Sequence, residues 1–274
     1  MFDRRFVIPA LLVLAQSTLA DDRSIVAKAV EACRRLGIHC DPARAKVYRL
    51  NPPGGSAVHK VQMSKVEVEL DEAGRAWTIV DRSSSSKSFL ANPARAFALF
   101  GFDPKQFDFE KSRWGGVPQY TLHPRSHGYP SLVRAASLWL DPKSGSVTRL
   151  FRAKPPTFDP PVVKLKPEET SRLAAPFLKK LWDARKHRFA DKPLPAEAEL
   201  AKTATLAYAT CYTNASRLAQ KRAGTRARLA YVFQDADYRL LMDAETGECM
   251  GGAWLNRTGA PLASSNFPPL AGRS

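Results

Sequence analysis

Three segments of the sequence share the pattern of a β-hairpin closed by a turn that begins with aspartate. Each has a run of strand formers, an Asp, a Gly three or four positions later and a second run of strand formers, in residues 65–80, 137–152 and 238–255. The Asp side chain can accept hydrogen bonds from its own turn, and Gly can adopt a positive φ angle. The pattern therefore predicts a sheet-rich protein made of repeated antiparallel hairpins. The irregular spacing of the three turns excludes a regular solenoid.

Helical patterns precede these strands. Apolar residues recur at three- and four-residue steps in residues 21–36, and a short helix is expected at residues 94–100 after an Asn-Pro start. A third helix begins at Pro167 with two Glu residues in its first turn, and Pro176 inside it should kink or split it. This order predicts an α+β fold with two or three repeated units, each a helix packed on an antiparallel β-sheet.

A proline-rich stretch divides the chain. Residues 154–167 contain five prolines, which is typical of an extended linker. We therefore expect an N-terminal α+β domain over residues 21–157, which can be divided into two units near the serine-rich residues 83–90. A C-terminal domain is expected over residues 158–258. The Pro-, Ser- and Gly-rich residues 259–274 should form a flexible tail.

The first twenty residues have the composition of a secretory signal peptide. Two arginines precede an apolar run at residues 6–14, and small residues occupy the cleavage positions before Asp21. A membrane anchor is the alternative, but the run is shorter than the ~20 residues that a spanning helix needs. We expect cleavage after Ala20 and a mature protein in the periplasm or outside the cell.

The four cysteines fit export to an oxidising compartment, where an even number is usually paired. Of the three possible connectivities we favour Cys33 with Cys40, which would join the end of a helix to the next turn, and Cys211 with Cys249, which would join two strands. A metal site is the alternative because His39 adjoins Cys40, but no second closely spaced pair completes a zinc set. We expect no metal ion and no cofactor.

The chain is strongly basic, with a formal net charge of +16. Arg4 and Arg5 against Asp3 give the signal segment +1, which leaves +15 on the mature chain. Such a surplus attracts anionic partners. The basic residues form no run of five or six, so a merely solubilising surface is an equally good interpretation. Trp182 falls on the apolar face of its helix, so no stacking surface for a specific nucleic acid is expected.

The C-terminal part of the chain, residues 162–255, resembles the PepSY domain family. The resemblance rests on the opening KPEETSRLAAPFL, the strand ARLAYVF and the hairpin YRLLMDAETGECMGG, whose Asp-x-x-Thr-Gly turn is the most recognisable piece. The DPKSG turn at residues 141–145 resembles a second, weaker copy. The repeated helix-and-hairpin pattern agrees with a PepSY-like architecture.

That family is associated with exported or membrane-linked proteins and with the propeptides of secreted metallopeptidases. The resemblance therefore implies a module that binds or restrains a peptidase. The sequence has no HExxH motif, so we expect any peptidase partner to be a separate chain. An exposed sheet edge or hairpin could occupy a cleft by strand addition. The candidate partner-binding hairpin comprises Asp243, Glu245, Thr246 and Gly247.

The sequence shows no catalytic motif. It lacks a GxSxG elbow, a phosphate-binding loop and a dinucleotide glycine fingerprint. His123 and His127 could share a metal ion on a helix, but the intervening Pro124 predicts a loop, where solvated histidines are more common. Glu245 and Glu248 are expected at a hairpin tip with ordinary acidities. A hydrolase with an unrecognised site is a third, weaker hypothesis.

Five phenylalanines at positions 97–109 could line a pocket, although core packing is their more common role.

These observations together favour an exported, non-catalytic binding module, with modulation or inhibition of a secreted peptidase as the leading role. The alternative is an electrostatic binder of anionic envelope polymers or lipids. High salt should abolish electrostatic binding but not a shape-matched complex.

Overall fold

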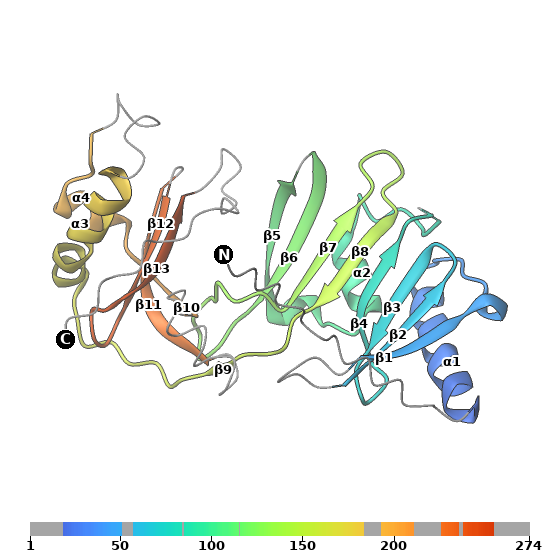
Figure 1. Cartoon of the computed structure of the whole chain (residues 1–274). Coiled ribbons are helices and arrows are strands. Elements are labelled where there is room, and N and C mark those ends of the chain that lie inside the picture. Colours follow the sequence, from blue (N-terminus) through green and yellow to red (C-terminus); the bar gives the residue numbers. More distant parts are fainter. Residues whose placement is uncertain are drawn as a thin grey trace, which may run out of the picture.

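The computed structural model places two β-sheets side by side, each covered by helices on one face (Figure 1). It describes residues 19–50, 57–83, 85–114, 116–183, 193–210, 226–235 and 238–254. The tail 259–274 and most of the predicted signal peptide lie outside the described residues. Among the residues that the structure describes, no helix is long and apolar enough to cross a bilayer.

The first unit is a long helix followed by four consecutive antiparallel strands. Its elements are α1 (Leu19–Arg35), η1 (Pro42–Arg44), β1 (Lys46–Leu50), β2 (Val58–Met63), β3 (Val66–Leu70) and β4 (Ala76–Asp81). Acidic residues in the first turn of α1 and basic residues in its last turn complement the helix dipole. Strand β3 alternates buried and half-buried residues, as its sequence predicts.

The second unit repeats this order with a shorter helix. Its elements are α2 (Pro93–Leu99), η2 (Pro104–Gln106), β5 (Phe107–Trp114), β6 (Val117–Pro124), β7 (Ala136–Leu140) and β8 (Val147–Arg152). The side chain of Asn92 accepts a hydrogen bond from the backbone N–H of Arg95 (3.2 Å), so the predicted start of α2 is confirmed.

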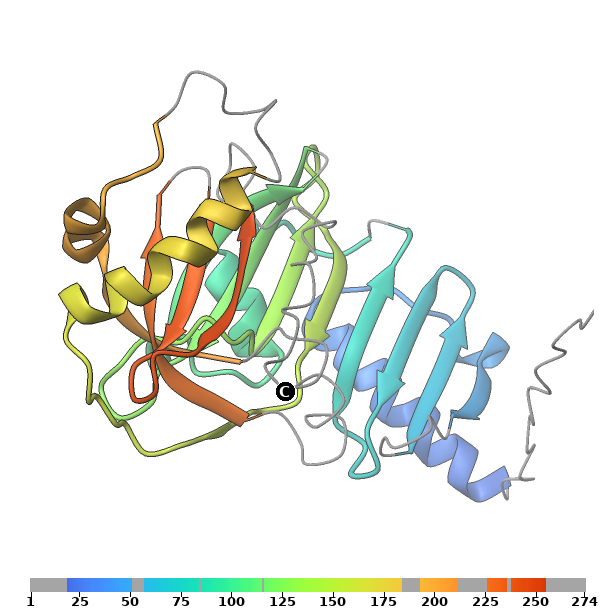
Figure 2. The ribbon, with the colours of Figure 1, turned by 60° about the vertical axis from the view of Figure 1, so that its left-hand side comes forward.

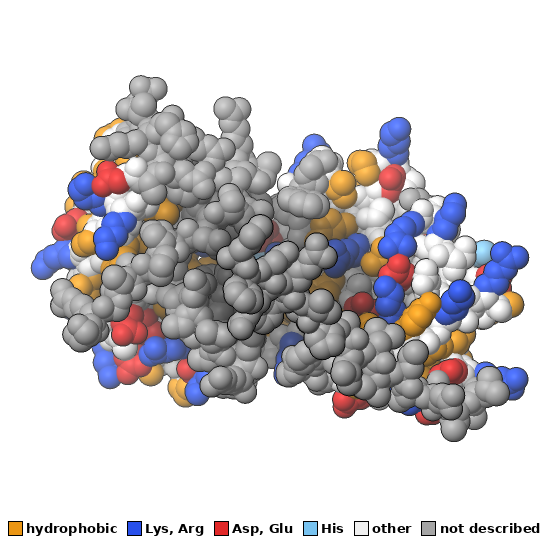
Figure 3. Space-filling model, viewed as in Figure 1, with side chains coloured by type: hydrophobic (Ala, Val, Ile, Leu, Met, Phe, Trp, Pro, Cys, Tyr) orange, Lys and Arg blue, Asp and Glu red, His pale blue; other side chains and the backbone are white. Residues whose placement is uncertain are grey.

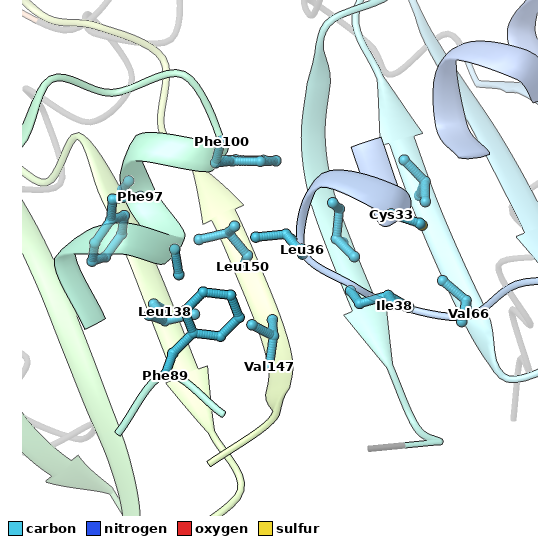
Figure 4. Packing of buried hydrophobic residues seen from close by; sticks show 14 of the residues in the cluster. Cys33, Leu36, Ile38, Val66, Phe89, Phe97, Phe100, Leu138, Val147 and Leu150 are labelled. Carbon is cyan, nitrogen blue, oxygen red and sulfur yellow. The ribbon is translucent and has the colours of Figure 1, made fainter. Parts of the chain in front are cut away.

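The two units form one sheet. Its strand order is β1-β2-β3-β4-β8-β7-β6-β5, so the last strand of each unit lies at the centre. Strands β4 and β8 pair antiparallel, and Ile79 stands opposite Leu150. Both helices cover the same face, and the buried residues form one cluster under them. Figure 4 shows Leu36, just after α1, and Leu150 of β8 pointing toward one another across the boundary between the units.

The third unit forms a separate sheet. Its elements are β9 (Thr157–Phe158), α3 (Pro167–Asp183), α4 (Glu197–Thr203), β10 (Thr205–Ala209), β11 (Arg226–Gln234), β12 (Tyr238–Asp243) and β13 (Cys249–Trp254). Strands β10 to β13 are antiparallel, and β9 pairs parallel with β11. Helices α3 and α4 lie on the face directed away from the eight-stranded sheet (Figures 1 and 2). Pro176 lies inside α3 without splitting it, contrary to one of the two sequence-based possibilities.

The predicted fold class is confirmed: the protein is α+β, with helices packed on antiparallel sheets. Strands β1, β2 and β5 were not predicted. The clean two-residue alternation that identifies β3 is missing from β1 and β2, and in β5 it covers only residues 107–110.

In each of the three aspartate turns, the carboxylate accepts hydrogen bonds from backbone N–H groups of its own turn. In the β7–β8 and β12–β13 turns, one carboxylate oxygen of Asp141 or Asp243 accepts from the backbone N–H groups two and three positions later, at 2.7–2.9 Å. In the β3–β4 turn, Asp71 accepts from the backbone N–H of Arg75 at 2.8 Å. A glycine with positive φ completes each turn: Gly74 (76°), Gly145 (73°) and Gly247 (73°). These turns are therefore structural devices that close each hairpin.

We expect Gly247→Ala to destabilise the protein more than a glycine substitution that adds backbone strain alone. A Cβ atom at position 247 would lie 2.5 Å from Leu173 Cδ1 and 2.9 Å from Leu165 Cδ1. Gly116 has a similar φ of +83° with nothing within 4 Å of the added atom. Urea denaturation should show a loss of about 1 kcal/mol for Gly116→Ala and about 2–3 kcal/mol for Gly247→Ala. Equal losses would contradict close packing of this turn on α3 and the linker.

Candidate functional site

The predicted partner-binding hairpin is held in place by ion pairs. Asp243 is only 1% exposed, and its Oδ2 lies 2.9 Å from Nη1 of Arg228. The same guanidinium lies 3.1 Å from Glu245, whose other oxygen is 2.7 Å from Nζ of Lys164. Lys164, with a smaller contribution from Arg228, lowers the pKa of Glu245, so the expectation of an ordinary acidity is wrong for this residue. Asp243 and Glu245 therefore act as counter-ions within the unit.

The rest of the turn is packed against the linker and α3. Gly247 is buried beneath Leu165 and Leu173, and the backbone N–H groups of residues 164 and 165 donate to the carbonyl oxygen of Ala244 (3.1 and 3.3 Å). Only Thr246 among the four predicted residues is exposed. The geometry leaves the hairpin a small surface for a partner.

The two predicted histidines have separate environments. His123 lies in β6, with Nε2 2.9 Å from Glu110 and Nδ1 3.2 Å from the carbonyl oxygen of Val133. His127 lies in the following loop, where its Nδ1 is 3.0 Å from the hydroxyl oxygen of Tyr208. The described residues contain no group of three or more His, Cys, Asp or Glu arranged to hold a metal ion. Each histidine is occupied by contacts that position the chain.

His127 belongs to the contact between the two sheets. The backbone of Tyr208 in β10 bonds to Pro130 and Leu132 of the β6–β7 loop, at 2.9 and 2.8 Å. The buried Tyr208 hydroxyl also donates to the carbonyl oxygen of Asp159 (2.8 Å). This loop therefore extends the edge of the C-terminal sheet and attaches the third unit to the second.

The cysteines predicted to pair are partly described. Cys33 and Cys40 are separate thiols whose side chains are within hydrogen-bonding contact. Burial is the main reason that the pKa of the Cys33 thiol is raised. Cys211 lies outside the described residues, while Cys249 begins β13. A disulfide between Cys33 and Cys40, and one between Cys211 and Cys249, remain predictions.

The aromatic and basic clusters have structural positions. Four of the five phenylalanines at positions 97–109 are buried in, or packed on, the core of the large sheet, while Phe109 is 44% exposed. Phe109 packs on Tyr120 with ring centroids 5.5 Å apart. Trp182 is 9% exposed and contacts Tyr238, and Lys179 pairs with Asp183 (2.9 Å). These residues form no aromatic surface for stacking bases.

The strongest candidate contact surface is the β1 edge of the eight-stranded sheet, which has a bonded neighbour on one side only. Val47 packs on the core and Arg49 pairs with Asp21 (2.9 Å), both on the helix-covered face. Tyr48 and Leu50 point to the opposite face and are each 41% exposed. Two large apolar side chains at alternate positions of an edge strand are unusual, because natural edges are normally protected by charge.

The opposite edge strand, β5, has that protection. Its Asp108 pairs with Arg125 (2.8 Å) and its Glu110 with His123, and Lys111 and Arg113 are exposed. The two ends of the sheet therefore differ in degree: β5 exposes Phe109 among charged side chains, whereas β1 exposes both Tyr48 and Leu50 with Lys46 as the exposed charge beside them. Sequence reasoning missed β1 because its five residues place apolar groups on both faces, which hides the two-residue period.

The sequence matches no protein-family model and no curated protein. Among solved structures, the fold is similar to the "Bacillus megaterium YpeB C-terminal domain", with a TM-score of 0.51 and 11% sequence identity. The similarity covers 88% of this chain and 100% of that chain. At this identity the likeness concerns the fold alone, and it agrees with the α+β architecture.

We expect the Glu110–His123 contact to contribute to stability in a pH-dependent manner. The hydrogen bond from His123 is the main cause that lowers the pKa of Glu110 below its usual 4.5. A carboxylate with a lowered folded-state pKa stabilises the protein above pH ~4.5, and that contribution is lost as the pH falls through the folded value. Glu110→Gln should therefore cost about 0.5–1 kcal/mol at neutral pH and flatten the loss of stability in acid.

The matched control is Glu69→Gln, since the structure gives Glu69 no ion pair among the described residues. Urea midpoints of both variants between pH 3 and 7 provide the measurement. A Glu110→Gln profile parallel to that of the unmodified protein would contradict the assignment.

Proposed function

We propose that this protein is an exported, non-catalytic binding module made of three PepSY-like units, and that it restrains a separate secreted peptidase. The sequence resemblance of the third unit, the helix-on-sheet repeat and the fold similarity support this choice of class. The proposed contact with the peptidase is through the edge strand β1, and it rests on the exposure of the apolar side chains Tyr48 and Leu50 there.

An edge strand suits a peptidase partner because peptidase clefts bind extended chains through backbone hydrogen bonds. Addition of a partner segment to β1 would supply such bonds, and the alternate side chains Tyr48 and Leu50 would supply selectivity. The hairpin at residues 243–247 is a weaker candidate, because Asp243 and Gly247 are already buried by their own unit.

Electrostatic binding of anionic envelope polymers or lipids is the second candidate, favoured by the net charge of +16. Figure 3 shows Lys and Arg side chains spread over the visible face of the eight-stranded sheet without gathering in one patch. Such a distribution favours weak, salt-dependent attraction over a defined complex.

The edge proposal predicts that a Tyr48→Ser/Leu50→Ser variant loses the partner. Purified chain 21–274 would be used to capture peptidases from the exported fraction of its own cells, at low and at high salt. We expect capture to persist at high salt and to fall at least about tenfold in the variant, because burial of two large side chains contributes about 3 kcal/mol or more.

A Val162→Ser/Val163→Ser variant is the matched control, since both valines are exposed in the linker, far from β1 along the chain. The control should capture the peptidase normally. Equal capture by both variants would exclude the β1 edge, and recovery of anionic polymers alone, released by salt, would replace the peptidase proposal with the electrostatic one.

If the protein is exported to an oxidising compartment, we expect Cys33 and Cys40 to form a disulfide in the mature protein. The two thiols are near enough to interact, because Cys40 contributes to the raised pKa of Cys33, and closing the short loop between them should stabilise the fold by about 2–3 kcal/mol. Protein from the exported fraction, denatured and alkylated before reduction, should leave both cysteines unmodified in its peptide mass spectrum. Alkylation of both without reductant would contradict the disulfide.

A further inference from the structure

A cleft of about 410 Å³ lies on the helix-covered face, where the first and second units meet. Its walls are α1, the β3–β4 turn, the C-terminal end of α2 and β8. One carboxylate, that of Glu31, lines the cleft. Four cationic side chains line it as well: Lys28, Arg35, Arg75 and Arg152. The volume is in the range of small-ligand sites.

Arg152 is the most constrained of these cations. Its Nη2 donates to the carbonyl oxygen of Phe100 (2.6 Å), and its guanidinium lies 5.2 and 4.2 Å from the ring centres of Phe100 and Phe102. Its Nε is buried without a hydrogen-bond partner, and among the described residues no carboxylate forms an ion pair with Arg152. Burial lowers the pKa of this guanidinium, which nevertheless stays protonated near neutrality. A half-buried cation that lines a cleft and lacks a carboxylate partner can pair with an anion there.

The carboxylates near the cleft are already engaged. Glu31 binds Arg34 and Arg35 at 2.8 and 3.1 Å, and Asp71 binds Arg75 at 2.8 Å. Lys28 has no ion pair among the described residues. The cleft therefore keeps positive charge that its own carboxylates do not neutralise.

Gly74 of the β3–β4 turn leaves room for the Lys28 side chain at the cleft. A Cβ atom at Gly74 would lie 2.5 Å from Nζ of Lys28, so the lysine side chain lies across the β3–β4 turn. The apolar part of the wall comes from Ala32, Ala76, Leu99 and Phe100. Figure 4 shows the Phe100 ring pointing from α2 toward the first unit. Charged and apolar surfaces are thus presented together.

From this arrangement we propose that the cleft binds a small ligand through a multiply charged oxyanion, either a phosphate or a carboxylate cluster, held by Arg152 and Lys28. The apolar wall would contact the remainder of the ligand. The site lies on the opposite face of the sheet from Tyr48 and Leu50, so it is independent of the proposed partner edge.

Isothermal titration of chain 21–274 with inorganic phosphate, phenyl phosphate and citrate, at constant ionic strength in chloride, tests the site. We expect saturable binding of at least one probe, and a preference between phosphates and citrate identifies the oxyanion. Arg152→Gln should weaken binding about tenfold or more, since a charge-assisted hydrogen bond contributes to that extent.

Lys28→Gln should weaken binding severalfold and is the second test, because Lys28 is exposed on α1 and its loss leaves the core intact. Arg149→Gln is the matched control. Arg149 belongs to the same strand as Arg152, and its guanidinium lies over Trp139 (5.3 Å) on the other face.

Binding retained by Arg149→Gln and weakened by Lys28→Gln and Arg152→Gln supports the site. Equal weakening in all three variants would show that binding depends only on the net charge of the protein, and it would overturn the proposed site. The absence of saturable binding by every probe would overturn it as well. None of these outcomes bears on peptidase capture through β1.

Discussion

The pairing of β4 with β8 is the contact on which the large domain depends. Each unit alone would be a four-stranded sheet with one helix and an apolar last strand at its edge. Ile79 and Leu150 stand opposite each other in this pair and are completely buried in the shared core, and full burial of such a side chain contributes about 1.5–3 kcal/mol. The pairing also covers two sheet edges that would otherwise invite association. The two cores become one beneath α1 and α2, and only β1 and β5 remain as edges.

The same pairing explains the location of the basic cleft. The helices of the two units cover a common face but leave a space where the end of α2 meets α1 and the β3–β4 turn. Arg152, in the last strand of the second unit, reaches the carbonyl end of α2 and closes one wall of that space. The third unit joins differently, through the β6–β7 loop and Tyr208, and keeps its own core.

Much of the fold could be predicted because local chemistry determines it. The aspartate turns need a side-chain acceptor and a residue with positive φ, and both requirements are visible in the sequence at Asp141 and Gly145 as clearly as at Asp243 and Gly247. The alternation of β3 and the Asn92 start of α2 are equally local signals. The exposure of the hairpin at residues 243–247 could not be predicted locally, because the exposure of a turn depends on what packs over it, and here Leu165 and Leu173 pack over Gly247.

The sequence by itself determined the α+β class and the repeated helix and hairpin units, because these follow from periodicity and turn chemistry within short segments. The tertiary structure alone decided which strands became edges and which charges lost their counter-ions. Tyr48 and Leu50 form an apolar edge only because β1 ends the sheet order. Lys28 and Arg152 are 124 residues apart in the chain (152 − 28) and line one cleft only because β4 pairs with β8. Such juxtapositions depend on contacts between distant segments, and no local pattern encodes them.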